Sequence, residues 1–175
     1  MESNVLVAYA SKHGATKEIA EKIGAVLRQV GLQADVIPAA GARDLNPYMA
    51  VILGSAVYIG KWHKDAEMFL QTNEKILADR PVWLFSSGPT GEGAPLELLG
   101  GQLLPVELGP VVDRIRPRGV TVFHGNINPE KLNLMEKLAI KNVAKKPFGD
   151  FRDWEAIERW SDSIAEALKK TAYAS

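Results

Sequence analysis

The chain has 175 residues with 21 basic and 21 acidic side chains, so no net charge favours binding to nucleic acid or to an acidic substrate. An apolar fraction of 46% and a charged fraction of 24% are ordinary for a globular protein, and we expect a single domain over residues 1–175. The absence of cysteine excludes disulfides, thiol catalysis and cysteine-ligated metal sites.

Apolar runs alternate with amphipathic runs along the first half of the chain. Continuous apolar runs are typical of strands covered on both faces, and apolar positions three and four residues apart are typical of helices. In chain order the pattern predicts a strand at residues 5–10, a helix at 15–30, strands at 34–37 and 50–53, and a helix at 64–78. Three apolar residues are expected on the inner side of that second helix: Met68, Phe69 and Ile76.

The second half continues this alternation around a long loop. It predicts a strand at 81–87, a loop at 88–109 with at most a short helix at 95–99, a short helix at 110–115, a strand at 119–124, and helices at 131–145 and 154–171. One face of the last helix is formed by Trp154, Ile157, Ser161, Ile164 and Leu168. A loop as long as 88–109 within a compact domain is usually functional or mobile.

This order of elements predicts an α/β fold. Strands that alternate with helices form a parallel sheet with right-handed crossovers and helices on both faces. Five strands favour a flavodoxin-like three-layer sandwich with a five-stranded parallel sheet in the order 2-1-3-4-5. In that order ligands bind beyond the carboxyl ends of strands 1, 3 and 4.

Several motifs that define other α/β sites are absent. No G-x-G-x-x-G follows the first strand, no Walker loop is present, and the ends of strands 1 and 3 lack the aspartates of a phosphorylatable receiver domain. There is no G-x-S-x-G or H-E-x-x-H motif, and His13, His63 and His124 are not spaced as metal ligands on one helix. We therefore expect no metal site, and no catalytic side chain is identified.

The six residues after the first strand are a candidate phosphate loop: Ser11, Lys12, His13, Gly14, Ala15 and Thr16. Its amides, its two hydroxyls and the positive end of a helix dipole suit a phosphate, and Gly14 allows close approach of the backbone. Lys12 or His13 could add charge from outside. The alternative is a helix start that is capped by Ser or Thr and contains a glycine turn.

Two further loops follow strands 3 and 4. Residues 54–63 carry Tyr58 and Trp62, which could flank a planar ring or could simply pack the loop onto the next helix. Residues 86–91 offer amides and hydroxyls to the polar edge of a ring, or form an ordinary Gly-Pro turn. Together the three loops predict a planar heterocycle on a short phosphorylated tail, for which FMN is the natural candidate.

These residues resemble those of flavodoxin-like FMN proteins. Residues 11–16 resemble the phosphate loop of that family. Residues 54–63, together with Asp153-Trp154-Glu155, resemble the flavodoxin-domain branch that includes menaquinone-dependent protoporphyrinogen IX dehydrogenase. The resemblance implies that residues 11–16 hold the phosphate. It implies that the ring is flanked by Ala56, Val57, Tyr58, Ile59 and Gly60, and that its polar edge is contacted by Ser87, Gly88, Pro89, Thr90 and Gly91.

The resemblance also implies an FMN-dependent oxidoreductase or electron-transfer protein, with a redox protein or a quinone-type small molecule as partner. Two alternatives are a quinone-dependent protoporphyrinogen IX dehydrogenase and a non-catalytic electron carrier. The chain departs from both. It is neutral where flavodoxin carriers are strongly acidic, and residues 87–91 do not closely match the corresponding loop of the porphyrinogen enzyme.

The segment from Leu132 to Lys146 combines apolar residues with lysines. Such a helix could rest on a membrane surface, or it could cover the sheet with its lysines in water, which is the usual arrangement. Met1-Glu2-Ser3-Asn4 lacks the basic region of a signal peptide, and no run approaches the roughly 20 apolar residues that span a bilayer. We therefore expect a cytoplasmic protein, peripheral at the inner membrane face under the first interpretation.

Overall fold

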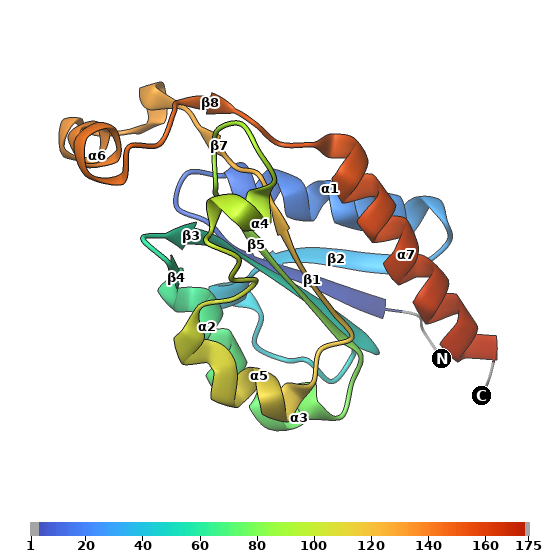
Figure 1. The fold of residues 1–175 in the computed structure, drawn as a ribbon. Helices are drawn as coiled ribbons and strands as arrows, with labels where there is room; N and C mark the ends of the chain where they lie inside the picture. The colour runs from blue at the N-terminus through green and yellow to red at the C-terminus, as the bar shows by residue number, and fades with distance from the viewer. Residues whose placement is uncertain (1–3, 174–175) are drawn as a thin grey trace.

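The computed structural model describes residues 4–173, so residues 1–3, on which the expectation about a signal peptide partly rests, lie outside the described part. Five parallel strands form the sheet in the order β2-β1-β3-β5-β6 (Figure 1). Their bounds are Asn4–Ala10 (β1), Gln33–Pro38 (β2), Ala50–Tyr58 (β3), Val82–Ser87 (β5) and Gly119–Phe123 (β6). This confirms the predicted order 2-1-3-4-5.

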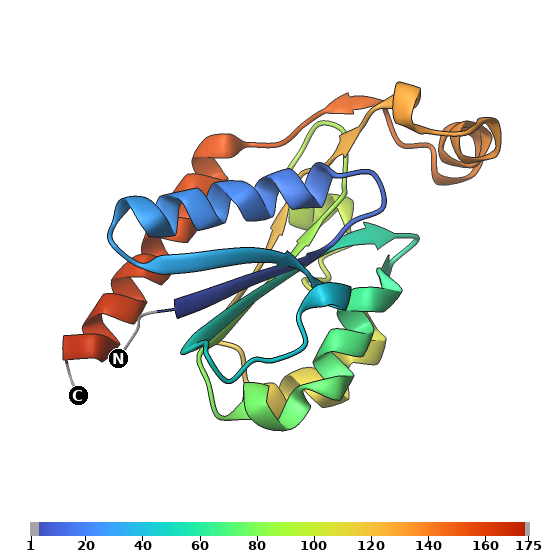
Figure 2. The ribbon, with the colours of Figure 1, turned by 180° about the vertical axis from the view of Figure 1, so that it is seen from behind.

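Helices cover both faces of the sheet and make three layers (Figures 1 and 2). One face is covered by α1 (Ala15–Gln29) and α7 (Trp154–Tyr173), and the other by α2 (Lys64–Thr72), α3 (Glu74–Ala78) and α5 (Gly109–Ile115). Alternate side chains of β1 enter separate cores, because Val5 and Val7 pack with the α1 side while Leu6 and Ala8 pack with the α2 side. This is why the strand is continuously apolar.

The last helix packs on the sheet largely as its sequence predicts. Ile157, Ser161, Ile164 and Leu168 have no exposed surface, whereas Trp154 is 37% exposed and lies instead beneath the Arg152 guanidinium. The buried Ser161 hydroxyl donates to the carbonyl of Ile157, which satisfies its hydrogen-bonding need within the helix.

Two predicted elements have different bounds in the structure. β3 continues through the predicted loop to Tyr58 and turns back into β4 (Lys61–Trp62), so Ala56, Val57 and Tyr58 belong to a strand. The helix predicted at 64–78 is broken at Asn73, whose side-chain amide donates to the carbonyl of Phe69. Met68, expected on the inner side, is 52% exposed, because the inner face of α2 is formed by Ala66, Phe69 and Leu70.

The long loop at 88–109 contains two short elements, α4 (Pro95–Leu98) and the 3-10 turn η2 (Val106–Leu108). A further 3-10 turn, η1 (Ala39–Gly41), follows β2.

The helix predicted at 131–145 is confirmed in part: the chain is helical over 134–144, but this helix does not cover the sheet. The chain forms the turn η3 (Pro129–Lys131), a short α6 (Leu134–Ala139) and a π-helical turn η4 (Ile140–Ala144). These lie between two paired antiparallel strands, β7 (Asn126–Ile127) and β8 (Gly149–Asp150). α6 buries no residue and stands beyond the end of the sheet, so it does not cover the sheet (Figure 1). We call residues 126–150 the strap.

Candidate functional site

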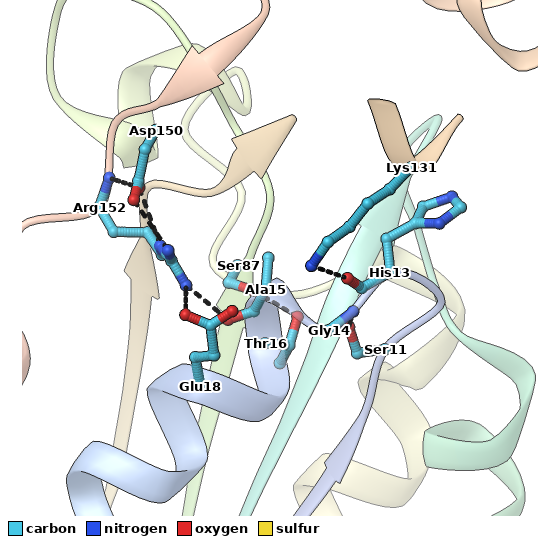
Figure 3. Close-up of polar contacts among 10 residues, drawn as sticks. All are labelled: Ser11, His13, Gly14, Ala15, Thr16, Glu18, Ser87, Lys131, Asp150 and Arg152. Atoms are coloured by element: carbon cyan, nitrogen blue, oxygen red, sulfur yellow. Dashed lines mark hydrogen bonds and ion pairs between the residues drawn. The ribbon is translucent and has the colours of Figure 1, made fainter. Parts of the chain in front are cut away.

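The predicted phosphate loop forms a sharp turn between β1 and α1. Gly14 adopts φ 90°, a left-handed conformation that favours glycine, and its N–H donates to Ser11 Oγ at 3.0 Å (Figure 3). The Ser11 hydroxyl therefore closes the turn and does not cap α1, and no side chain among the described residues caps the first turn of this helix. The interpretation as a Ser- or Thr-capped helix start is wrong, and the first amides of α1 are left for another acceptor.

A buried hydrogen bond joins the first and third predicted loops. Thr16 Oγ1 lies 2.8 Å from Ser87 Oγ, and both side chains are about 1% exposed (Figure 3). Since one hydroxyl donates to the other, one hydroxyl hydrogen of the pair remains available to a further acceptor. The start of α1 and the end of β5 are thus held together at the place where the sequence predicts a shared site.

The second predicted loop is the β3–β4 hairpin. Ile59 and Gly60 form its tip with φ values of 49° and 72°, as a two-residue hairpin turn requires. A β-branched residue is strained at positive φ, and Ile59 is also 86% exposed, so its conformation is not maintained by burial. Tyr58 beside it is 42% exposed. This tip presents apolar surface at the carboxyl end of the sheet.

The two aromatic residues of this region have different roles. Trp62 is buried and its Nε1–H donates to Ser86 Oγ at 2.8 Å, so its packing role is confirmed and it does not flank a ligand. Tyr58 lies toward the phosphate loop. Burial raises the pKa of Tyr58, the backbone N–H of Lys12 lowers it in part, and the Glu136 carboxylate raises it further.

The third loop, residues 87–91, contains a buried hydroxyl without a partner. Thr90 is only 5% exposed, and no group among the described residues hydrogen-bonds to its Oγ1. An unsatisfied buried hydroxyl costs free energy unless a ligand or water completes it. Gly88 packs so closely on the β3 backbone that an added Cβ would lie 3.1 Å from the carbonyl oxygen of Val57. The second and third loops therefore meet.

The strap contacts the phosphate loop, an arrangement that sequence reasoning missed. Glu136 Oε2 lies 3.1 Å from Lys12 Nζ and 2.8 Å from His13 Nε2. The hydrogen bonds from His13 and then from Lys12 hold the pKa of Glu136 below its ordinary value. The two side chains expected to add charge near a phosphate are therefore occupied by a carboxylate.

The strap reaches the other loops as well. Pro147 lies against Gly91, since a Cβ at Gly91 would be 3.4 Å from Pro147 Cγ. At the base of the strap, the N–H of Gly125 donates to the carbonyl of Pro89 at 2.9 Å. The only sequence signal for this docking is the spacing Asn133-x-x-Glu136, which forms a capping box at the start of α6 and fixes the direction of Glu136.

Arg152, just after the strap, anchors the start of α1. Its side chain is 5% exposed and binds Asp150, Glu18 and the carbonyl of Ala15 (Figure 3). Asp150 above all raises the pKa of Arg152, and the guanidinium in turn lowers the pKa of Asp150. Because its donors are used by these oxygens, Arg152 is a structural clamp on the loop.

The geometry fits FMN. The uncapped start of α1 suits a phosphate, the hairpin tip offers apolar surface to a planar ring, and the unpartnered Thr90 hydroxyl suits the polar edge of that ring. Within the described residues, no three His, Asp or Glu side chains gather as a metal site requires. No helix of residues 4–173 is long and apolar enough to cross a membrane.

Comparison with known proteins finds one family and a curated relative. The family model for the flavodoxin domain matches residues 6–152. Protoporphyrinogen IX dehydrogenase [quinone] of Escherichia coli K12 is 21% identical over 186 residues, which cover 94% of this chain and 96% of that protein.

Solved flavodoxin structures share the fold. A flavodoxin from the domain Archaea has a TM-score of 0.60 at 18% identity and covers 95% of this chain and 99% of its own. Oxidised flavodoxin 1 from Bacillus cereus has a TM-score of 0.59 at 16% identity and covers 94% of this chain and 98% of its own.

Proposed function

Because the chain belongs to the flavodoxin domain family, with FMN as cofactor and a general function in electron transfer or oxidoreduction, we propose that it is an FMN-dependent oxidoreductase with a quinone-type acceptor. When bound, the flavin supplies the redox chemistry by accepting and giving up one or two electrons. The chain's own residues bind it, orient it and shield it from water. The observation that carries the proposal is that three predicted loops meet: the buried Thr16–Ser87 hydrogen bond joins the first to the third, and Gly88 packs on the β3 backbone at Val57.

Each loop has one task in this proposal. Residues 11–16 and the first amides of α1 bind the phosphate. Residues 56–60 flank the ring with the exposed Tyr58 and Ile59, and residues 87–91 bind its polar edge. Thr90 Oγ1 is the natural partner for a ring oxygen or nitrogen, since a flavin there would complete a hydroxyl that otherwise lacks a hydrogen bond.

The variant Thr90→Val tests this arrangement. Without flavin, we expect it to raise the free energy of unfolding by about 1 kcal/mol, because an isosteric methyl removes an unsatisfied polar group. With flavin, we expect roughly tenfold weaker binding of both FMN and riboflavin, from the loss of one hydrogen bond. Thr121→Val, on a half-exposed strand position without a side-chain hydrogen bond among the described residues, is the control. Unchanged flavin affinity in Thr90→Val would show that this hydroxyl does not face the ring.

The acceptor is tested by anaerobic turnover. The purified protein should show flavin absorption at about 370 and 450 nm, a property of the cofactor. Reduced protein mixed with a menaquinone analogue should then be reoxidised over many turnovers, with protoporphyrinogen IX tried as donor. Tight FMN binding without turnover of either compound would instead favour the electron carrier.

A second observation favours peripheral contact of the strap with a bilayer. Leu134, Met135 and Val143 are 73%, 78% and 76% exposed. Five lysines lie on the same segment: Lys131, Lys137, Lys141, Lys145 and Lys146. Exposed apolar side chains next to cations suit the surface of an anionic membrane, where a lipid-soluble quinone would be found.

Vesicle co-sedimentation tests this contact. The protein should bind vesicles of phosphatidylcholine with phosphatidylglycerol more than vesicles of phosphatidylcholine alone, and added salt should weaken the binding. The double variant Met135→Ser and Val143→Ser should lose most of it. Val106→Ser, which removes a 72% exposed valine outside the strap, is the matched control. Equal binding by all three proteins would rule out the strap as the contact.

A further inference from the structure

Lys131 lies at the phosphate loop although it is far from that loop in the sequence. It ends the turn η3, which begins with Asn128 Oδ1 accepting from the N–H of Glu130, so the position of its backbone is fixed. Its Nζ donates to the carbonyl of His13 at 3.4 Å (Figure 3). A Cβ added to Gly14 would lie 4.0 Å from the same ammonium group. The cation therefore stands over the sharpest point of the turn.

The other cations around this loop are already paired. Lys12 and His13 share the Glu136 carboxylate, and Arg152 binds Asp150 and Glu18. Among residues 4–173, Lys131 has no carboxylate within ion-pairing distance, and its bond to His13 is long and exposed. Little free energy is lost when such a bond is replaced by a bond to a charged acceptor. Among the described residues around the loop, Lys131 is thus the cation that is available to bind an anion.

We propose that Lys131 is a phosphate-binding residue of the cofactor site and that it makes the site prefer FMN to riboflavin. The inference rests on the proposed role of residues 11–16. A phosphate dianion at the uncapped start of α1 would sit beside this ammonium group, which adds a charge-assisted hydrogen bond to those of the backbone amides. The strap is then part of the cofactor site.

Flavin titrations of the apoprotein test this role. Lys131→Gln should weaken FMN binding roughly fivefold or more, as expected for one charge-assisted contact near the surface, and should leave riboflavin binding unchanged. Lys131→Arg should keep most of the FMN affinity. Lys141→Gln is the matched control, because Lys141 is an exposed strap lysine without an ion pair among the described residues. Added salt should weaken FMN binding more in the wild type than in Lys131→Gln.

Each result has a defined meaning. Equal FMN affinity in Lys131→Gln and Lys141→Gln would overturn the proposal. A parallel loss of FMN and riboflavin affinity would also overturn it, since it would mean that Lys131 supports the fold of the loop. A wild-type protein that binds neither flavin would refute the proposed function itself, and this failure is seen before any variant is compared.

Discussion

Single glycines decide how closely the loops of the site approach one another. A Cβ at Gly125 would lie 2.6 Å from the Cα of Gly88, and a Cβ at Gly88 would lie 3.1 Å from the carbonyl oxygen of Val57. The connection after β6, the loop after β5 and the end of β3 are therefore stacked backbone on backbone. Any side chain between them would move the loop proposed to hold the polar edge of the ring.

Gly125→Ala is expected to displace this loop. The added methyl meets backbone atoms that cannot turn aside, so we expect a loss of about 1–3 kcal/mol in the free energy of unfolding and roughly tenfold weaker flavin binding. Chemical denaturation and flavin titration measure the two effects. Gly41→Ala is the control, since Gly41 is exposed and a Cβ there would meet only the Ile37 side chain, at an ordinary contact distance of 3.7 Å. Identical behaviour of the two variants would contradict the close packing at Gly125.

The pH dependence of the strap follows from Glu136. Its pKa is lowered from the ordinary value of 4.5, first by His13 and then by Lys12, so the carboxylate is the form that is stabilised in the folded protein. The contribution of Glu136 is present above the ordinary value and is lost as the pH falls through the lowered one. A carboxyl carbon NMR titration should therefore show Glu136 ionising below the usual glutamate range. Lys12→Gln should move the midpoint back toward it, and an unshifted midpoint in the wild type would mean that the strap is not docked.

At the residue level, the sequence predicts the site residues that directly follow a strand. It misses the site residues that come from distant parts of the chain. The turn at Ser11 and Gly14 is predictable because it joins a strand to a helix directly, and glycine marks its positive φ. Lys131, Glu136 and Arg152 reach the same loop from more than 110 residues away. No local pattern encodes that pairing, since a surface lysine in water and a lysine over a ligand loop have the same neighbours in sequence.

The strap lies outside the three layers of sheet and helices that form the rest of the structure. Its helix α6 has exposed apolar residues and no buried ones, so packing does not hold it in place. The contacts that hold the strap are mainly polar: the pair of Glu136 with Lys12 and His13, the bond of Lys131 to His13, and the β7–β8 ladder at its base, beside the packing of Pro147 on Gly91. An element held by a few contacts near the surface opens at low free-energy cost.

Glu136→Gln is expected to loosen the strap without unfolding α6. Glutamine preserves the capping box but removes the charge that pairs with Lys12 and His13. Limited trypsin digestion should cut the lysines of residues 131–146 several times faster in this variant than in the wild type. Glu130→Gln removes a charge from the neighbouring turn η3, where no ion pair forms among the described residues, and should leave the rate unchanged. Equal rates in all three proteins would refute the docking role of Glu136.

At the element level, the predictions that held were those fixed by burial. The five strands and the long helices α1 and α7 each have a continuous or periodic apolar pattern that the cores require. The break at Asn73, the extension of β3 to Tyr58 and the position of the helix at 134–144 away from the sheet were missed. Each depends on a polar contact or a tertiary pairing that overrides local propensity, such as the Asn73 bond to Phe69 or the pairing of Val57 with Trp62.

In the whole molecule, the cofactor site brings together three loops and the strap, which have few contacts with one another in the fold itself. The loops after β1, β3 and β5 and the strap all meet at one end of the sheet, as the view in Figure 1 shows. A ligand that contacts all of them binds only the folded state, and it therefore stabilises the whole domain.

FMN is therefore expected to raise the melting temperature. At a free concentration about 100 times its Kd, binding adds about 2.7 kcal/mol to the free energy of unfolding. For a chain of this size that corresponds to a rise of roughly 5–10 °C in Tm, measured by differential scanning calorimetry of the apoprotein with and without FMN. Inorganic phosphate at the same concentration should give a much smaller rise, and no shift with FMN would contradict binding to the folded state.

The short β7–β8 ladder gives the strap a property of its own. Asn126 pairs with Asp150 and Ile127 with Gly149, so the two ends of the strap lie side by side at the body of the protein. The entropy of closing a loop depends only weakly on its length. We expect the segment between these strands to tolerate changes of length without rerouting the sheet, because the ladder fixes both of its ends. Such changes would act on the phosphate loop instead, through the contacts of Glu136 and Lys131.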